Sequence, residues 1–182
     1  MNSGYFFKLA VHNLRYHKRL YLPLMVAQSF MIAMFYNNTF LVSNQEFISV
    51  PGVAGMLEFY IFSLFYVGIF ACLFTVYLNF FAAKQRKHEL GIYTALGMEK
   101  RHIAKLIVHE NLILSAITLA GGLLLGIILS KLLMVFLCNI IKTNTTIPFS
   151  ISLLGVLGTL VLFILVFFFI LIARIISTNF SA

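Results

Sequence analysis

The chain has 182 residues, of which 62% are hydrophobic and 10% are charged, and its formal net charge is +8. Soluble domains typically contain about 45–50% apolar and about 25% charged residues, so this composition excludes an ordinary soluble domain and indicates a membrane protein. A positive charge can also indicate nucleic-acid binding. Here, however, the cations adjoin apolar runs, which is the pattern of the positive-inside rule, and we expect no nucleic-acid partner.

The N-terminal segment, residues 1–19, carries four Lys/Arg residues interleaved with apolar ones. It lacks the small-residue cleavage site that follows the short apolar core of a signal peptide. We therefore expect a retained amphipathic helix on the cytoplasmic face that leads into the first membrane span.

Four long apolar runs follow, and about 20 apolar residues suffice to cross a bilayer as a helix. We place the spans at about residues 20–42, 58–83, 106–138 and 151–173. The predicted fold is an all-α membrane protein with a four-helix transmembrane domain over residues 20–174 and a short cytoplasmic tail, residues 175–182.

The third span contains a carboxylate, Glu110, close to its cytoplasmic start. A charge at that depth is costly unless it is paired or hydrated. We expect a membrane-embedded ion pair in preference to a proton-handling group. The cations that the sequence places within reach are Arg101, Lys105 and His109.

Further along the same span, Gly122 and Gly126 form a G-x-x-x-G pattern. Small residues at this spacing let two helices approach closely in lipid. We therefore expect these two glycines to serve helix packing.

A polar stretch, residues 84–105, separates the second and third spans and holds six of the thirteen Lys/Arg residues. Within it, Leu90, Tyr93 and Leu96 are spaced to form an apolar stripe on one side of a helix. Gly97 follows, as glycine often does just past a helix end. The pattern favours a short helix on the cytoplasmic membrane face that contacts another protein, and a membrane-surface helix without a partner is the alternative.

The distribution of cations predicts the orientation. Eleven Lys/Arg residues fall in the N-terminal segment, the stretch 84–105 and the C-terminal end, whereas the two outer loops hold one, Lys142. Cytoplasmic loops carry the excess of Lys/Arg, so both termini are expected to be cytoplasmic.

Motifs for catalysis or nucleotide binding are incomplete. Two His-Glu pairs, at Glu89 and Glu110, lack the second histidine of the H-E-x-x-H zinc motif. Gly121 and Gly126 have the spacing of a P-loop, but Ile127 occupies the position of its lysine. No Cys/His cluster has metal-ligand spacing. We expect no catalytic residue, no metal site and no cofactor.

From Arg86 the polar stretch reads RKHELGIYTALGM, and Ile103 and Glu110-Asn111-Leu112 follow. This sequence resembles the signature of FtsX-like (MacB-type) ABC-transporter permeases, in which a basic residue, Glu, an apolar residue, Gly and then Leu-Gly follow a membrane helix, and a Glu opens the next helix. The short outer loop, residues 43–57, is most similar to the bacitracin-exporter (Bce-type) branch.

The resemblance implies the permease subunit of a bacterial ABC transporter in the plasma membrane, or its N-terminal four-helix part. It implies a role in resistance to, or sensing of, bacitracin-type antimicrobial peptides. The stretch 84–105 would be the coupling helix, seated on a separate ABC ATPase subunit that hydrolyses ATP. The residues implied in this coupling are Arg86, Glu89, Gly91, Leu96 and Gly97.

Further implied partners are membrane lipid, a histidine kinase, and a second permease chain or the remaining permease half, because Bce-type permeases are several times longer. Two other functions also fit four spans. One is a small membrane interaction or regulatory protein without ATPase coupling. The other is a holin-like pore former, which gives the basic stretch no clear role. A neighbouring gene for an ABC ATPase would favour the permease.

Overall fold

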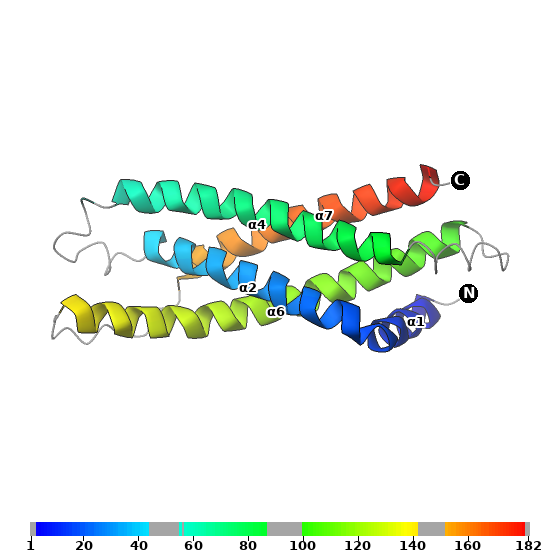
Figure 1. The fold of residues 1–182 in the computed structure, drawn as a ribbon, viewed down its shortest axis with the longest axis horizontal. Coiled ribbons are helices and arrows are strands. Elements are labelled where there is room, and N and C mark those ends of the chain that lie inside the picture. Colours follow the sequence, from blue (N-terminus) through cyan, green and yellow to red (C-terminus); the bar gives the residue numbers. More distant parts are fainter. Residues whose placement is uncertain (1–2, 44–54, 56, 87–99, 142–151, 181–182) are drawn as a thin grey trace.

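The computed structural model describes residues 3–43, 55, 57–86, 100–141 and 152–180. Its helices are α1 (Ser3–Tyr16), α2 (Lys18–Ser43), α4 (Leu57–Gln85), α6 (Lys100–Ile141) and α7 (Leu153–Phe180). The four longer helices lie side by side along one axis, and α1 lies at one end of this bundle (Figure 1). The described residues contain no strand, so the predicted all-α fold is confirmed.

Four helices are long and apolar enough to cross a membrane. They are Lys18–Ser43, Glu58–Gln85, His102–Phe136 and Leu153–Ile176. Their outward faces carry large apolar side chains, which lipid tolerates and water does not. The prediction of a four-span membrane protein is therefore confirmed. The limits of the individual spans and of the domain stay predictions, because a helix end does not mark where the bilayer begins.

Helix α2 is the centre of the bundle and contacts α4, α6 and α7. In its most apolar stretch, 50% of the residues are buried inside the bundle, whereas the corresponding share in the other three spans is 17–22%. On α2, Ile32 and Phe35 pack with Ala71 of α4 and with Phe163 of α7. The Phe35 and Phe163 rings meet edge to face with centroids 6.0 Å apart, a favoured aromatic geometry.

Two glycines bring α6 against α2. A Cβ added to Gly122 would lie 2.6 Å from the Ile32 Cβ and 2.9 Å from the Ser29 carbonyl oxygen. A Cβ on Gly126 would lie 2.8 Å from the Tyr36 ring. Because these distances are shorter than carbon contacts allow, only glycine fits without movement of α2. The G-x-x-x-G residues therefore lie on the face of α6 that packs against α2.

Hydrogen bonds supplement this close contact. The Ser29 hydroxyl donates to the Thr118 carbonyl oxygen at 3.3 Å. The Asn37 amide donates to the carbonyl oxygen of Ala33 at 2.8 Å and to that of Gly126 at 3.4 Å. Asn37 and Ser29 thus use their polar groups between helices, as polar residues in membrane helices commonly do.

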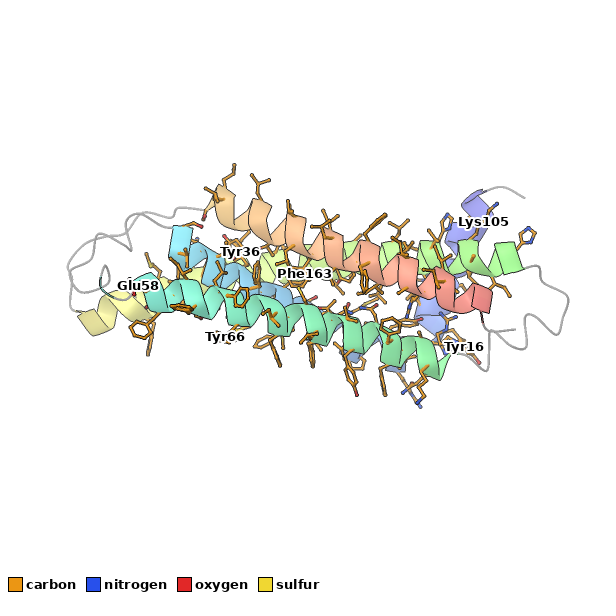
Figure 2. All side chains as sticks on the ribbon, turned by 90° about the horizontal axis from the view of Figure 1, so that it is seen from above. Tyr16, Tyr36, Glu58, Tyr66, Lys105 and Phe163 are labelled. Carbon is orange, nitrogen blue, oxygen red and sulfur yellow. The ribbon has the colours of Figure 1, made fainter. Side chains whose placement is uncertain are left out.

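Helix α1 does not continue the direction of α2. The chain turns at His17, whose carbonyl oxygen accepts the backbone N–H groups of Leu20 and Tyr21 at 2.9 and 3.1 Å. Beyond this turn α1 runs across the end of the bundle and packs mainly on α6 (Figures 1 and 2). The N-terminal helix therefore lies at the end of the bundle where α4 ends and α6 begins.

Candidate functional site at the basic end of the bundle

A cluster of polar side chains is buried at the end of the bundle occupied by α1. Its centre is the ion pair between Arg86, just after α4, and Glu110 of α6. Both residues are almost inaccessible, at 5% and 3% exposure. We call Arg86, Glu110, Tyr21 and Asn13 the polar cluster, because hydrogen bonds join all four.

Each carboxylate oxygen of Glu110 has a partner. Oε2 accepts from Nη1 of Arg86, and Oε1 accepts from Nδ2 of Asn13 on α1 at 3.2 Å. The Arg86 Nη1 also donates to the Tyr21 hydroxyl at 2.7 Å, and the guanidinium carbon lies 5.7 Å from the centroid of the Tyr21 ring. The cluster therefore joins α1, α2, the end of α4 and α6.

Local sequence explains how these side chains meet. Arg86 lies in a turn closed by its backbone N–H, which donates to the Ala83 carbonyl oxygen at 3.2 Å. On α6, Glu110 shares its helix face with buried Ile103, Leu106 and Leu114, since residues three, four or seven apart lie on one side. This face is the one that meets the rest of the bundle, so the carboxylate points inward.

The fourth span reaches the same end of the bundle. Arg174 of α7 donates from Nη2 to the Asn79 carbonyl oxygen on α4 at 2.9 Å. The Asn79 amide in turn donates to the Thr75 carbonyl oxygen at 2.9 Å. All five of the described helices therefore contribute polar groups at this end of the bundle.

The charge on Arg86 is matched to its surroundings. Burial alone lowers the pKa of the guanidinium, but the Glu110 carboxylate and the Tyr21 hydroxyl together outweigh burial and raise that pKa above its ordinary value. Arg86 therefore stays protonated. A buried pair of this kind is tolerated only when hydrogen bonds satisfy the remaining polar atoms, and Tyr21 and Asn13 supply them.

The ion pair that the structure describes joins Glu110 to Arg86, which is not one of the three cations that sequence spacing brought within reach. Lys105 is exposed, and the His109 ring lies 2.7 Å from the Lys105 carbonyl oxygen. The side chain of Arg101 lies outside the described residues. Arg86 comes from the turn after α4, 24 positions away, and local spacing along α6 carries no information about it.

The coupling residues inferred from the sequence divide into two groups. Arg86 is described, and its buried side chain faces Glu110 instead of the molecular surface. Glu89, Gly91, Leu96 and Gly97 fall outside the described residues, as does the predicted helix that contains them. Arg86 directly precedes residues 87–99, and Glu110 lies on α6, which begins after them at Lys100.

Sequence reasoning missed Tyr21 and Asn13. Asn13 lies between buried Ala10 and Leu14 on the inward face of α1, so an amide on an otherwise apolar face was the signal that could have found it. Tyr21 has no comparable signal. Among the residues that the structure describes, no group of His, Cys, Asp and Glu could hold a metal ion.

The chain is similar in sequence to known membrane permeases. Residues 60–180 match the family described as FtsX-like permease C-terminal. The bacitracin export permease protein BceB of Halalkalibacterium halodurans is 31% identical over 101 residues, covering 56% of this chain and 16% of the relative. BceB of Bacillus subtilis is 28% identical over 149 residues, covering 79% and 22%.

A third relative is the ABC transporter permease protein YxdM of Bacillus subtilis. It is 27% identical over 133 residues, which cover 69% of this chain and 20% of the relative. The chain thus spans only about a fifth of the length of these curated relatives.

Proposed function

Because the chain belongs to the FtsX-like permease family, we propose that it is the permease subunit of a bacterial ABC transporter, or a fragment of one, coupled to a separate ATPase through residues 84–105. Two of its relatives are named bacitracin export permeases. Their names support a role in resistance to, or sensing of, antimicrobial peptides of that kind. The work of ATP hydrolysis is assigned to the partner subunit.

The observation that carries the proposal is the pair between Arg86, within residues 84–105, and Glu110, just after that segment on α6. The pair joins the end of α4 to α6, and Tyr21 and Asn13 extend the connection to α2 and α1. A displacement of residues 87–99 toward or away from the membrane would then move α4 and α6 together. ATP-driven closure of an ATPase pair would supply that displacement.

This proposal gives Arg86 a different role from the other coupling residues. Its buried guanidinium anchors the segment to the bundle. Contact with the ATPase is assigned to Glu89 and to Leu96 on the apolar stripe, with Gly91 and Gly97 setting the backbone path. Those four assignments rest on the sequence pattern.

Two further partners belong to the proposal. A second permease chain or a remaining permease half is supported by the small share of the relatives' length that this chain spans. A histidine kinase is supported only by the resemblance to Bce-type permeases. We infer that both termini are cytoplasmic, because most of the exposed cations that the structure describes lie at the end of the bundle where α1 lies.

Co-purification tests the coupling directly. The tagged chain is expressed with a candidate ABC ATPase from the same organism, and recovery of the ATPase and vanadate-sensitive ATP hydrolysis are measured. Glu89→Lys should abolish recovery. Glu58→Lys, which makes the same charge change on an exposed residue at the opposite end of the bundle (Figure 2), should leave recovery unchanged.

Equal recovery with both variants would overturn the proposal. It would favour a four-span interaction protein that works without an ATPase. If both variants lose the ATPase and the folded chain is also lost on gel filtration, misfolding explains the loss. The Leu96→Ala variant, which changes no charge and removes only apolar contact, then tests the coupling.

A further inference from the structure

Helix α1 has two chemically different faces. Ala10, Asn13 and Leu14 are buried and face α6. Lys8, His12 and Arg15, which follow one another at steps of four and three residues, lie on the opposite side and are exposed. Residues at this spacing share one side of a helix. One face therefore holds α1 on the bundle, and the other presents cations to the surroundings.

Further cations follow at the start of α2. Lys18 and Arg19 are exposed there, so four Lys/Arg residues within twelve positions are exposed around the junction of α1 and α2. Of the carboxylates that the structure describes, Glu110 is buried within the polar cluster and Glu58 lies at the far end of the bundle (Figure 2). Near α1, the described part of the chain thus offers these cations no exposed carboxylate.

The position of α1 fits the surface of a membrane. It runs across the bundle axis, and so parallel to a bilayer that the bundle crosses (Figures 1 and 2). Its depth is fixed by the bond from Asn13 to Glu110, close to the ends of the apolar helices. Amphipathic helices with Lys and Arg on the polar face lie in the interface in this way.

Apolar side chains next to the cations favour lipid over an acidic protein surface. Tyr16 is 78% exposed, and Leu22 and Val26 of α2 are each 60% exposed. These side chains would contact acyl chains and the interface, where tyrosine is enriched. Cations directly above a lipid-facing apolar surface are placed to meet phosphate groups of the same lipids.

We propose that the exposed cations of α1 and of the start of α2, which are Lys8, Arg15, Lys18 and Arg19, form a binding surface for the headgroups of anionic phospholipids. The charge is complementary, since juxtamembrane Lys and Arg residues attract anionic lipids additively. The opposite face of the same helix donates to Glu110, so bound lipid and the polar cluster hold α1 from its two sides. This proposal requires no ATPase, and its failure would leave the coupling through residues 84–105 untouched.

Fluorescence quenching tests the preference, because the chain contains no tryptophan. Tyr16→Trp introduces a single reporter beside the cations. The full chain is reconstituted into phosphatidylcholine vesicles with a minor share of phosphatidylglycerol. A brominated acyl chain is carried either by the phosphatidylglycerol or by an equal amount of the phosphatidylcholine. Both leaflets have the same composition, so the orientation of the inserted chain does not matter.

We expect quenching by brominated phosphatidylglycerol to exceed that by brominated phosphatidylcholine about twofold or more, since several cations act together. The excess should shrink as salt is raised, because screening weakens attraction at an exposed surface. Replacing all four cations with Gln should bring the ratio to one. Equal quenching by the two lipids in the Tyr16→Trp protein that keeps all four cations would overturn the proposal. It would favour an acidic protein as the partner of these cations.

Two controls separate this surface from general electrostatics and from misfolding. Lys18→Gln with Arg19→Gln removes two charges from the surface, and Lys84→Gln with Lys105→Gln removes two exposed charges elsewhere at the same end. Only the first pair should lower the ratio, and equal effects would count against a specific surface. Exchanging Lys for Arg and Arg for Lys at the four positions keeps the charge and should keep the ratio; loss of the ratio there would overturn the proposal.

Discussion

At the scale of single residues, the pair between Arg86 and Glu110 is held by its neighbours as much as by its own charges. Desolvation of two ions can exceed their mutual attraction unless other hydrogen bonds complete the site. Here Asn13 occupies one carboxylate oxygen and Tyr21 accepts from the guanidinium. The pair is therefore tolerable when intact, whereas removal of one partner leaves the other as a buried charge that has lost its counter-ion.

Removal of one partner of the Arg86–Glu110 pair is predicted to lower the free energy of unfolding far more than removal of both partners. Glu110→Ala should lower the free energy of unfolding by about 3–5 kcal/mol, because it leaves Arg86 charged and buried. Combining Arg86→Met with Glu110→Leu should recover most of that loss. Tyr21→Phe should cost only about 1 kcal/mol, the usual contribution of one hydrogen bond. Unfolding in one detergent, followed by circular dichroism, measures all of these variants.

The contradicting result is a double variant no more stable than Glu110→Ala. That result would mean that the carboxylate stabilises the bundle by a contact other than its pair with Arg86. A stable double variant is useful in itself, because its ATPase coupling can then be measured without a stability defect. If ATPase coupling survives in the double variant, the Arg86–Glu110 pair is not needed to transmit motion from residues 87–99 to the bundle.

At the scale of helices, the bundle is organised by the approach of α6 to α2. Backbone contact at Gly122 brings the two helices together, and α2 then fills the space between α4, α6 and α7. In lipid no hydrophobic effect drives helices together, so close packing and interhelical hydrogen bonds carry the association. A methyl group at Gly122 is therefore expected to act on the whole interface.

Gly122→Ala is predicted to lower the free energy of unfolding by about 1–3 kcal/mol, as overpacking of a tight core does. The added Cβ meets the Ser29 carbonyl oxygen, which is backbone and cannot turn aside. Gly158→Ala is the matched control, because its Cβ would lie 3.7 Å from the Thr39 methyl group, an ordinary contact. The same unfolding measurement should find Gly158→Ala neutral or slightly stabilising, since Ala favours a helix. Similar losses for both variants would contradict this account of the interface.

The helices also show which properties a sequence can reveal. The four spans follow from the length and apolarity of the runs alone, and the face of α6 that meets α2 follows from the spacing of Gly122 and Gly126. The need of Glu110 for a partner follows from the cost of a charge in lipid. The identity of that partner does not follow, because it depends on how α4 packs against α6, and the cations next to Glu110 in sequence lie on the same helix. Asn13 and Tyr21 were missed for the same reason.

At the scale of the whole molecule, charge is distributed unevenly between the two ends of the bundle. Tyr16 and Lys105 lie at one end and Glu58 lies at the other (Figure 2). Most of the exposed cations that the structure describes lie near the first end, namely Lys8, Arg15, Lys18, Arg19, Lys84 and Lys105, whereas Lys131 lies toward the far end of α6. Cytoplasmic segments retain Lys and Arg during insertion, so this end, with both termini, is expected to face the cytoplasm.

Cysteine labelling in intact cells tests that orientation. In a background with Cys72→Ala and Cys138→Ala, a single cysteine is introduced by Glu58→Cys or by Lys18→Cys, both at exposed positions. A membrane-impermeant maleimide should label Glu58→Cys in intact cells and Lys18→Cys only after the cells are permeabilised. The positive-inside rule requires this asymmetry, because moving four cations of the N-terminal segment across the membrane is strongly disfavoured. Labelling of Lys18→Cys from outside would place the segment 84–105 on the external side, where no ATPase could reach it, and the proposed coupling would fail with it.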